Sequence, residues 1–200
     1  VVQIAISLVV LSAAALFARH LSNLKTVGVG FDSDSVLLVS LDPAQTGHEP
    51  AALSRLYDEL LRTLEGIPGV ESATLSGTTP IHGAGASRFV KVEGHTEDPS
   101  TRRFVAVNWV APKYFETFRT PLVAGRDFKG AGETGAPVAI INQSMARHYF
   151  GDTNPLGRHF TFDKFSRRYE VVGVVGDAKY YNLHDPAPRT VYLDAFQDED

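Results

Sequence analysis

The residues that most often carry chemistry are scattered in this sequence, and few have the spacing that a cofactor site needs. Gly83-Ala84-Gly85 supplies the first two glycines of a dinucleotide-binding turn. A strand is predicted to follow at Phe89, however, where that motif requires a helix. No phosphate-binding loop of the form G-x-x-x-x-G-K-[ST] occurs. We therefore predict a flexible loop at Gly83 and no cofactor.

Histidines and acidic residues offer only weak metal-ligand patterns. His82 and His95 bracket a predicted strand and could converge, but no third ligand accompanies them, and no H-E-x-x-H occurs among the seven histidines. Asp32-Ser33-Asp34 followed by Asp42 is faintly similar to a calcium loop, but Leu37 stands at the sixth position, where that loop has glycine. We predict a solvated turn at Asp32 and no metal site.

No nucleophile stands in a catalytic context. Ser76 lacks the G-x-S-x-G elbow of a hydrolase, and the absence of cysteine excludes a thiolate nucleophile and a disulfide framework. Asn142 opens an N-x-S sequon but is more simply a helix cap. The composition, with 44% apolar and 21% charged residues and a net charge of −4, is typical of a folded chain and excludes a basic nucleic-acid binder. We predict no catalytic residue.

The first 18 residues contain no charge, proline or glycine. As a helix they would span about 27 Å, close to the thickness of a bilayer's hydrocarbon core. A signal peptide would have a charged start and a shorter apolar run, and a buried core helix would have a fuller polar stripe. We predict a transmembrane helix at 1–21 and expect the chain to be a segment of a longer protein.

The clearest periodicity after this helix is an apolar stripe from Leu53 to Leu64, which predicts an amphipathic helix that ends at Gly66. Apolar runs at 36–41 and 70–76 predict flanking strands, and together these elements form a β-α-β unit. Further strands are predicted at 89–93, 103–110, 138–141, 159–162, 169–175 and 190–193, short helices at 112–118 and 145–149, and a turn at 122–128. This order predicts an α+β domain.

A series of motifs in matching order resembles the MacB-like periplasmic core domain of FtsX-like ABC transporter permeases. They are the apolar helix running into Arg19-His20-Leu21, Gly30-Phe31-Asp32-Ser33-Asp34, Pro68-Gly69-Val70-Glu71-Ser72-Ala73, Pro112 to Phe118 with Gly125-Arg126-Asp127-Phe128, Ile141 to Ala146 with Tyr149-Phe150, Asn154-Pro155-Leu156-Gly157, and Val172 to Asp177 with Val191-Tyr192-Leu193. The resemblance covers nearly the whole chain.

The resemblance implies a MacB-like core domain at 22–200 in which a βαβ-containing subdomain is interrupted by a smaller β-rich one. We place the first subdomain at about 32–111 and 188–200, where it is incomplete, and the second at about 112–187. It also implies an inner-membrane permease segment without catalytic activity, whose residues after about 21 are extracytoplasmic. The implied partners are an ABC-type ATPase subunit, a second permease copy or half, membrane lipid and an outer-face partner protein, with no nucleic acid.

Such a segment would couple ATP hydrolysis in a separate nucleotide-binding domain to transport, such as efflux, or to mechanical work at the outer membrane face. Two other classes share the anchor and remain open on the residues alone. One is a membrane-anchored extracytoplasmic binding or sensor domain, and the other is an anchored hydrolase. A run of apolar segments downstream would favour the permease, and a signalling domain would favour the sensor.

Overall fold

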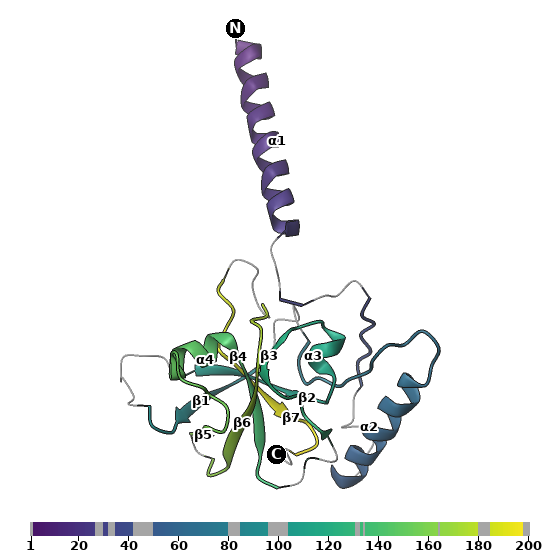
Figure 1. Ribbon diagram of the computed structural model, residues 1–200. Coiled ribbons are helices and arrows are strands. Elements are labelled where there is room, and N and C mark those ends of the chain that lie inside the picture. The colour runs from purple at the N-terminus through teal and green to yellow at the C-terminus, as the bar shows by residue number, and fades with distance from the viewer. Residues whose placement is uncertain are drawn as a thin grey trace.

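The computed structural model describes residues 2–26, 30–31, 35–41, 50–79, 85–95, 104–130, 133, 135–163, 165–179 and 185–197. Within these residues the chain forms one long apolar helix and a domain built on a single mixed sheet (Figure 1). The elements are α1 (Val2–Thr26), α2 (Pro50–Glu65), β1 (Ala86–Val92), β2 (Phe104–Val110), α3 (Tyr114–Thr117), β3 (Leu122–Gly125), β4 (Val138–Asn142), α4 (Gln143–Phe150), β5 (His159–Phe162), β6 (Arg168–Val175) and β7 (Thr190–Asp194).

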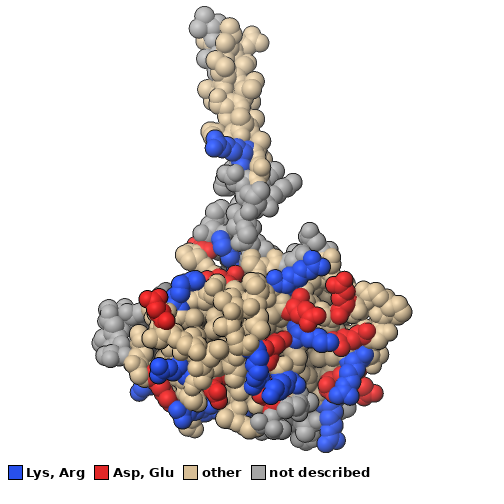
Figure 2. All heavy atoms as spheres, in the orientation of Figure 1, with Lys and Arg blue, Asp and Glu red and all other residues tan. Residues whose placement is uncertain are grey.

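Helix α1 confirms the predicted apolar helix and projects away from the domain (Figure 1). Its 25 residues correspond to about 38 Å, more than the roughly 30 Å of a hydrocarbon core. The large apolar side chains described along it are 59–74% exposed, and Figure 2 shows basic atoms only near its domain-proximal end. A helix that is apolar all round and touches no protein requires an apolar surrounding, and α1 is long and apolar enough to cross a membrane.

The strands follow the order β3-β6-β4-β7-β2-β1-β5, and β5 also pairs with β6. This additional pairing closes six strands into a ring, with β3 hydrogen-bonded outside the ring to β6. The pairs β2–β7 and β4–β6 are parallel, while the other pairs are antiparallel. Closure leaves few unpaired strand edges, which protects the sheet from pairing with other chains.

The core has two parts, one on each face of the central strands. Every residue of β4 and β7 is buried, as expected for strands covered on both sides. Ala139 and Ile141 pack into one cluster with the α4 residues Met145 and Tyr149, while Ile140 packs into the other cluster. The second cluster also holds α3 and its flanks, so the aromatic helix predicted at 112–118 is confirmed as core.

Asn142 caps α4 as predicted, with its side-chain oxygen accepting a hydrogen bond from the Met145 N–H at 3.1 Å. The same oxygen accepts from the Thr190 N–H at 2.9 Å, and the amide nitrogen donates to the Pro188 carbonyl at 2.8 Å. One buried side chain therefore joins β4, α4 and the start of β7, and this fixes how the helix lies on the sheet.

Both strands predicted to flank α2 are wrong. Residues 35–41 contain no strand, because a strand requires a partner edge and no described strand pairs with this segment. Leu37 within it is 87% exposed. At 70–76 only Ser76 forms a bridge, with Val110. Next to that bridge the Asn108 side chain takes the place of a backbone partner, accepting from Thr78 N at 2.9 Å and donating to Thr78 O at 2.8 Å.

Two other boundaries differ from the prediction or remain open. Residues 122–125, predicted as part of a turn, form strand β3 because β6 offers them an antiparallel edge. The division into a first subdomain at 32–111 and 188–200 and a second at 112–187 stays a prediction. Strands from both of these parts share the one sheet described here.

A buried carboxyl group lies at the end of β7. Asp194 is 1% exposed, and its Oδ1 accepts from the Phe196 N–H at 2.9 Å, whereas its Oδ2 lies within hydrogen-bond distance of no group among the described residues. Burial, together with the nearby carboxylates of Glu133 and Asp127, raises the pKa of Asp194 to about 6 from 3.8. The ionised form is thus disfavoured in the folded state.

We predict that Asp194 makes the domain less stable as the pH rises. Because its folded pKa is above its unfolded value, its stabilising contribution is complete below about pH 4 and is lost as the pH rises through about 6. At about 1.4 kcal/mol per pH unit, the loss is about 3 kcal/mol. Asp194→Asn should abolish this pH dependence in chemical unfolding of the full chain in micelles. Asp152→Asn, on an exposed turn, should retain this pH dependence. If the free energy of unfolding changed equally with pH in both variants, the pH dependence would not come from Asp194.

Candidate functional site

After α1 and residues 27–29, the first described residue of the domain is Gly30. Any other residue at this position would require the neighbouring backbone to move. Gly30 has φ +82°, a conformation that glycine adopts easily. A Cβ atom at this position would lie 2.0 Å from the Asp177 carbonyl oxygen and 2.9 Å from the Ala178 Cα. The backbone therefore lies directly against the loop that follows β6. We name Gly30, Phe31, Thr120, Asp177 and Ala178 the junction.

Two further contacts hold the junction. The Thr120 hydroxyl, which is buried, donates to the Gly30 carbonyl at 3.1 Å across a sequence separation of 90 residues. The Phe31 ring meets the Phe118 ring edge to face at 6.2 Å and packs on the core cluster that contains α3. The backbone of Gly30 and the side chain of Phe31 are therefore both attached to the domain.

From the junction, contacts continue into α4. Asp177 Oδ1 accepts from the Ser144 N–H at 2.7 Å, and its Oδ2 accepts from the Ser144 hydroxyl at 2.9 Å. The Arg147 guanidinium also donates to Oδ2, at 2.5 Å. A carboxylate at the first turn of a helix satisfies free N–H groups and favours the helix dipole. Displacement of the junction would thus act on α4 and, through its cap, on the sheet.

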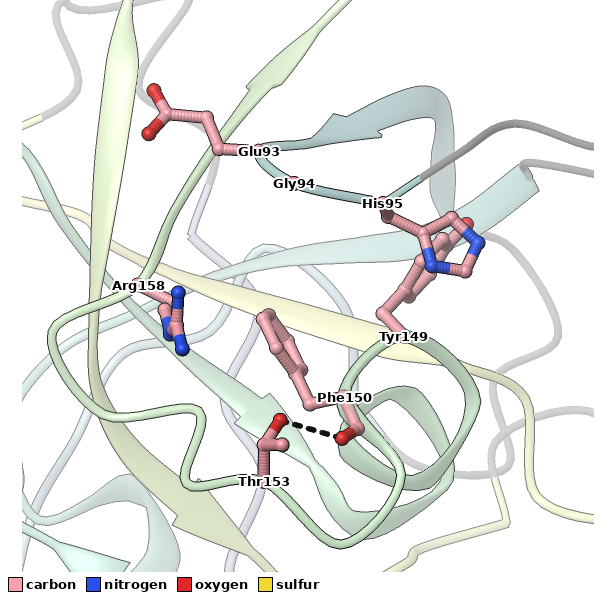
Figure 3. A pocket seen from close by; sticks show the side chains of 7 residues that line it. All are labelled: Glu93, Gly94, His95, Tyr149, Phe150, Thr153 and Arg158. Atoms are coloured by element: carbon pink, nitrogen blue, oxygen red, sulfur yellow. Dashed lines mark hydrogen bonds between the residues drawn. The ribbon is translucent and has the colours of Figure 1, made fainter.

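A second feature is a small cleft, of about 120 Å³, between the turn after β1, the end of α4 and the segment before β5. Glu93, Gly94, His95, Tyr149, Phe150, Thr153 and Arg158 line it. Figure 3 shows the Phe150 ring standing between Arg158 on one side and His95 with Tyr149 on the other. The Thr153 hydroxyl donates to the Phe150 carbonyl at 2.6 Å, which closes the end of α4 (Figure 3).

Basic side chains gather on the Tyr149 ring in this region. The His95 ring lies 5.1 Å and the His148 ring 4.6 Å from the Tyr149 ring, and the two histidine rings are 6.3 Å apart. The Arg189 guanidinium lies 6.0 Å from the same ring. Burial, and then the charges of Arg189 and His95, lower the pKa of His148.

Of the residues considered for chemistry in the sequence, Ser76 and His95 lie in described parts of the chain, as does Leu37. The Ser76 hydroxyl donates to the Thr78 carbonyl at 2.6 Å and accepts from Asn108 Nδ2 at 3.0 Å, which is a structural role. His95 lies in the cleft. His82, Asp32–Asp34, Asp42 and Gly83-Ala84 lie outside the described residues.

No group of three or more histidine, cysteine, aspartate or glutamate side chains within the described ranges could hold a metal ion. The expected lack of catalytic, cofactor and metal residues stays a prediction. Sequence reasoning missed both the junction and the cleft, since each depends on residues far apart along the chain. The one signal for the junction was glycine at position 30, directly before an aromatic residue in a segment that follows an apolar helix.

Comparison with known families decides the identity of the domain. The family model described as MacB-like periplasmic core domain matches residues 2–198. The chain belongs to this family. It is therefore a MacB-like periplasmic core domain, the type found in permeases of ABC transporters. Domains of this family are generally noncatalytic.

Three solved structures are similar to this MacB-like domain: the periplasmic region of MacB from Actinobacillus actinomycetemcomitans, the extracellular domain of the ABC-type transporter YknZ from Gram-positive bacteria, and a permease domain from Porphyromonas gingivalis. Their identities are 21%, 20% and 22%, with TM-scores of 0.46, 0.45 and 0.46. The matches cover 69%, 69% and 67% of this chain and 54%, 62% and 50% of the other chains. A comparison with curated proteins finds no match.

The assignment to the family confirms the resemblance seen in the motifs, and it rests on the sequence match. It also agrees with the mixed helix and sheet composition and with the apolar helix at the start of the chain. Because the chain spans half to three fifths of the solved relatives, the activity of a whole transporter is a matter for proposal.

We predict that Gly30→Ala destabilises the domain more than Gly69→Ala. Both glycines have positive φ, so alanine costs about 1–2 kcal/mol of backbone strain at either position. Only at Gly30 does the new methyl group also collide with a neighbouring backbone, which adds about 1–3 kcal/mol. Chemical unfolding of the two variants in micelles gives the comparison, and equal losses would refute the contact between Gly30 and Asp177.

Proposed function

We propose that the chain is the extracytoplasmic and first-membrane-helix portion of an ABC transporter permease. In this proposal it couples ATP hydrolysis in a separate nucleotide-binding domain to transport or mechanical work at the outer membrane face. The observation that carries the proposal is the junction, where the backbone at Gly30, which follows the end of α1 at Thr26 by a few residues, is fixed to the domain by Gly30, Phe31 and Thr120.

The physical argument concerns how displacement is transmitted. A helix moves as a rigid element, and packed interfaces transmit motion when they hold one discrete arrangement. If the chain after α1 were free, tilting of α1 would be absorbed by the connector. Attachment of Phe31 to the core and of Gly30 to the Asp177 loop limits the connector to residues 27–29, and in the proposal the motion of α1 therefore reaches α4 and the sheet.

The proposed location is the inner membrane, with residues after about 21 extracytoplasmic. The exposed and uncharged stretch of α1 before Arg19 supports contact with lipid. The proposed partners are an ABC-type ATPase subunit, a second permease copy or half, and an outer-face partner protein. Membership of a permease family favours this function over a membrane-anchored sensor domain, which would require only the anchor and a binding surface.

We expect the junction to be necessary for coupling. The chain has no cysteine, so Lys91→Cys on exposed β1 gives a single labelling site within it. With the permease and its ATPase in nanodiscs, energy transfer from a dye at this site to labelled lipid headgroups should change when ATP is added. Phe31→Ala should reduce that change by at least half while ATP hydrolysis continues, because the ring contact with Phe118 is lost.

The matched control is Phe89→Ala, which removes an exposed ring on β1 far along the chain from the junction and should leave the change intact. Absence of any ATP-dependent change in the parent protein would overturn the coupling proposal. An equal response of the parent and of Phe31→Ala would show that the domain is not driven through the junction.

Topology gives a separate prediction. In intact cells, a membrane-impermeant maleimide that enters the periplasm should label Lys91→Cys, since the domain is extracytoplasmic in the proposal. Gln3→Cys, near the opposite end of α1, should react only after the inner membrane is opened. The reverse pattern would place the domain in the cytoplasm and would exclude a permease of this orientation.

A further inference from the structure

Helix α2 contacts the rest of the domain near its C-terminal end. None of its side chains that the structure describes is buried, although its leucines form one apolar stripe, and in Figure 1 the helix stands beside the sheet. Its last residue, Glu65, accepts a hydrogen bond from the Lys113 ammonium at 2.6 Å. This hydrogen bond lowers the pKa of the Glu65 carboxyl, although burial opposes the effect. A helix without a buried face depends on such contacts for its position.

The segment that follows α2 is held at the same place. The hydroxyl oxygens of Ser72 and Thr117 lie 2.9 Å apart, and Thr117 is the last residue of α3. The Thr74 hydroxyl donates to the Ala111 carbonyl at 3.2 Å. The backbone at and just before α3 therefore carries both the end of α2 and the chain that leaves it.

Lys113 connects three segments through its three polar groups. Its N–H donates to Asp127 Oδ2 at 2.9 Å in the loop after β3, its carbonyl accepts from the Thr117 N–H at 2.8 Å, and its ammonium holds Glu65. Its backbone has φ +65°, a left-handed conformation that is unfavourable for a residue with a Cβ atom. Such a conformation persists only where the surrounding contacts fix it. The backbone from which the ammonium reaches α2 is thus fixed by the loop and by α3.

The other end of α3 belongs to the junction. The Phe118 ring meets the Phe31 ring at 6.2 Å, and the Thr120 hydroxyl donates to the Gly30 carbonyl at 3.1 Å. Arg119, between Phe118 and Thr120, has φ +51° and is a second left-handed residue next to this helix. One helical turn that is closed by hydrogen bonds at both ends forms a rigid connection between the junction and the start of α3.

We infer that Lys113 is a positioning residue that makes α2 follow the junction. Motion of α1 reaches α3 at Phe118 and Thr120 and leaves it at Lys113, whose ammonium carries Glu65 with it. The source of this motion rests on the proposed function, whereas the placing of α2 by Lys113 does not. Because an exposed ion pair contributes little to stability, its loss should change the position of α2 and leave the stability of the domain nearly unchanged.

The first experiment measures the position of α2 in the full chain in micelles. The chain has no cysteine, so spin labels at Arg55→Cys on exposed α2 and at Lys91→Cys on β1 report one distance distribution. Lys113→Glu brings two carboxylates together and should shift and broaden this distribution. Adding Glu65→Lys to Lys113→Glu should restore the distribution of the parent, because the ion pair forms again with its charges reversed.

The matched control is Arg158→Glu, the same reversal of charge at an exposed residue before β5, which should leave the distribution unchanged. Chemical unfolding should give all these variants the midpoint of the parent. The inference is overturned if Lys113→Glu has the parent's distribution, or if the second substitution does not restore it. A lower unfolding midpoint of Lys113→Glu that the second substitution leaves low would also overturn it, because the role would then be structural.

The second experiment adds ATP to the permease and its ATPase in nanodiscs. Energy transfer from a dye at Arg55→Cys to labelled lipid headgroups should change with ATP, and Lys113→Glu should reduce this change by at least half. The same substitution should leave the change at a dye on Lys91→Cys intact. If neither dye responds in the parent, the coupling proposal and this inference both fail. If the β1 dye responds and Lys113→Glu leaves the response of the α2 dye unchanged, the inference fails and coupling stands.

Discussion

Strand β6 makes the hydrogen bonds on which the rest of the domain depends. One of its edges pairs along most of its length with β4, while the other is shared, with β5 at residues 168–170 and β3 at residues 173–175. The change of partner occurs near Gly173, where a Cβ would lie 2.5 Å from the Arg126 carbonyl oxygen. A side chain at this position would push the backbone at the end of β3 away from β6, so the pairing of β3 with β6 requires glycine there.

The parts of the fold that sequence could predict are those governed by local rules. The long uncharged apolar run predicted α1, the period of the apolar residues predicted α2, the short apolar run predicted β4, and Asn142 marked the start of α4. The two strands predicted beside α2 failed for a non-local reason. Apolar composition at 36–41 shows a tendency to extend, but a strand exists only where a partner edge is available.

The candidate site could not be predicted in the same way. The junction joins residues 30, 120 and 177, and the cleft joins three segments that the sheet brings together. Nothing in the neighbourhood of Arg158 or His95 along the chain indicates that they share a space. Family motifs identified the type of domain because several of them occur in the expected order along the chain. A single contact between distant residues, by contrast, produces no recognisable motif near either residue.

The long sequence separation within the junction has a consequence for how the protein is made. Synthesis proceeds from the N-terminus, so the apolar helix and Gly30 emerge from the ribosome first. Their docking surface appears much later, when Thr120 and then the loop at Asp177 have been added. The contacts that fix Gly30 to the domain can therefore form only after residue 178 has been synthesised, long after α1 itself.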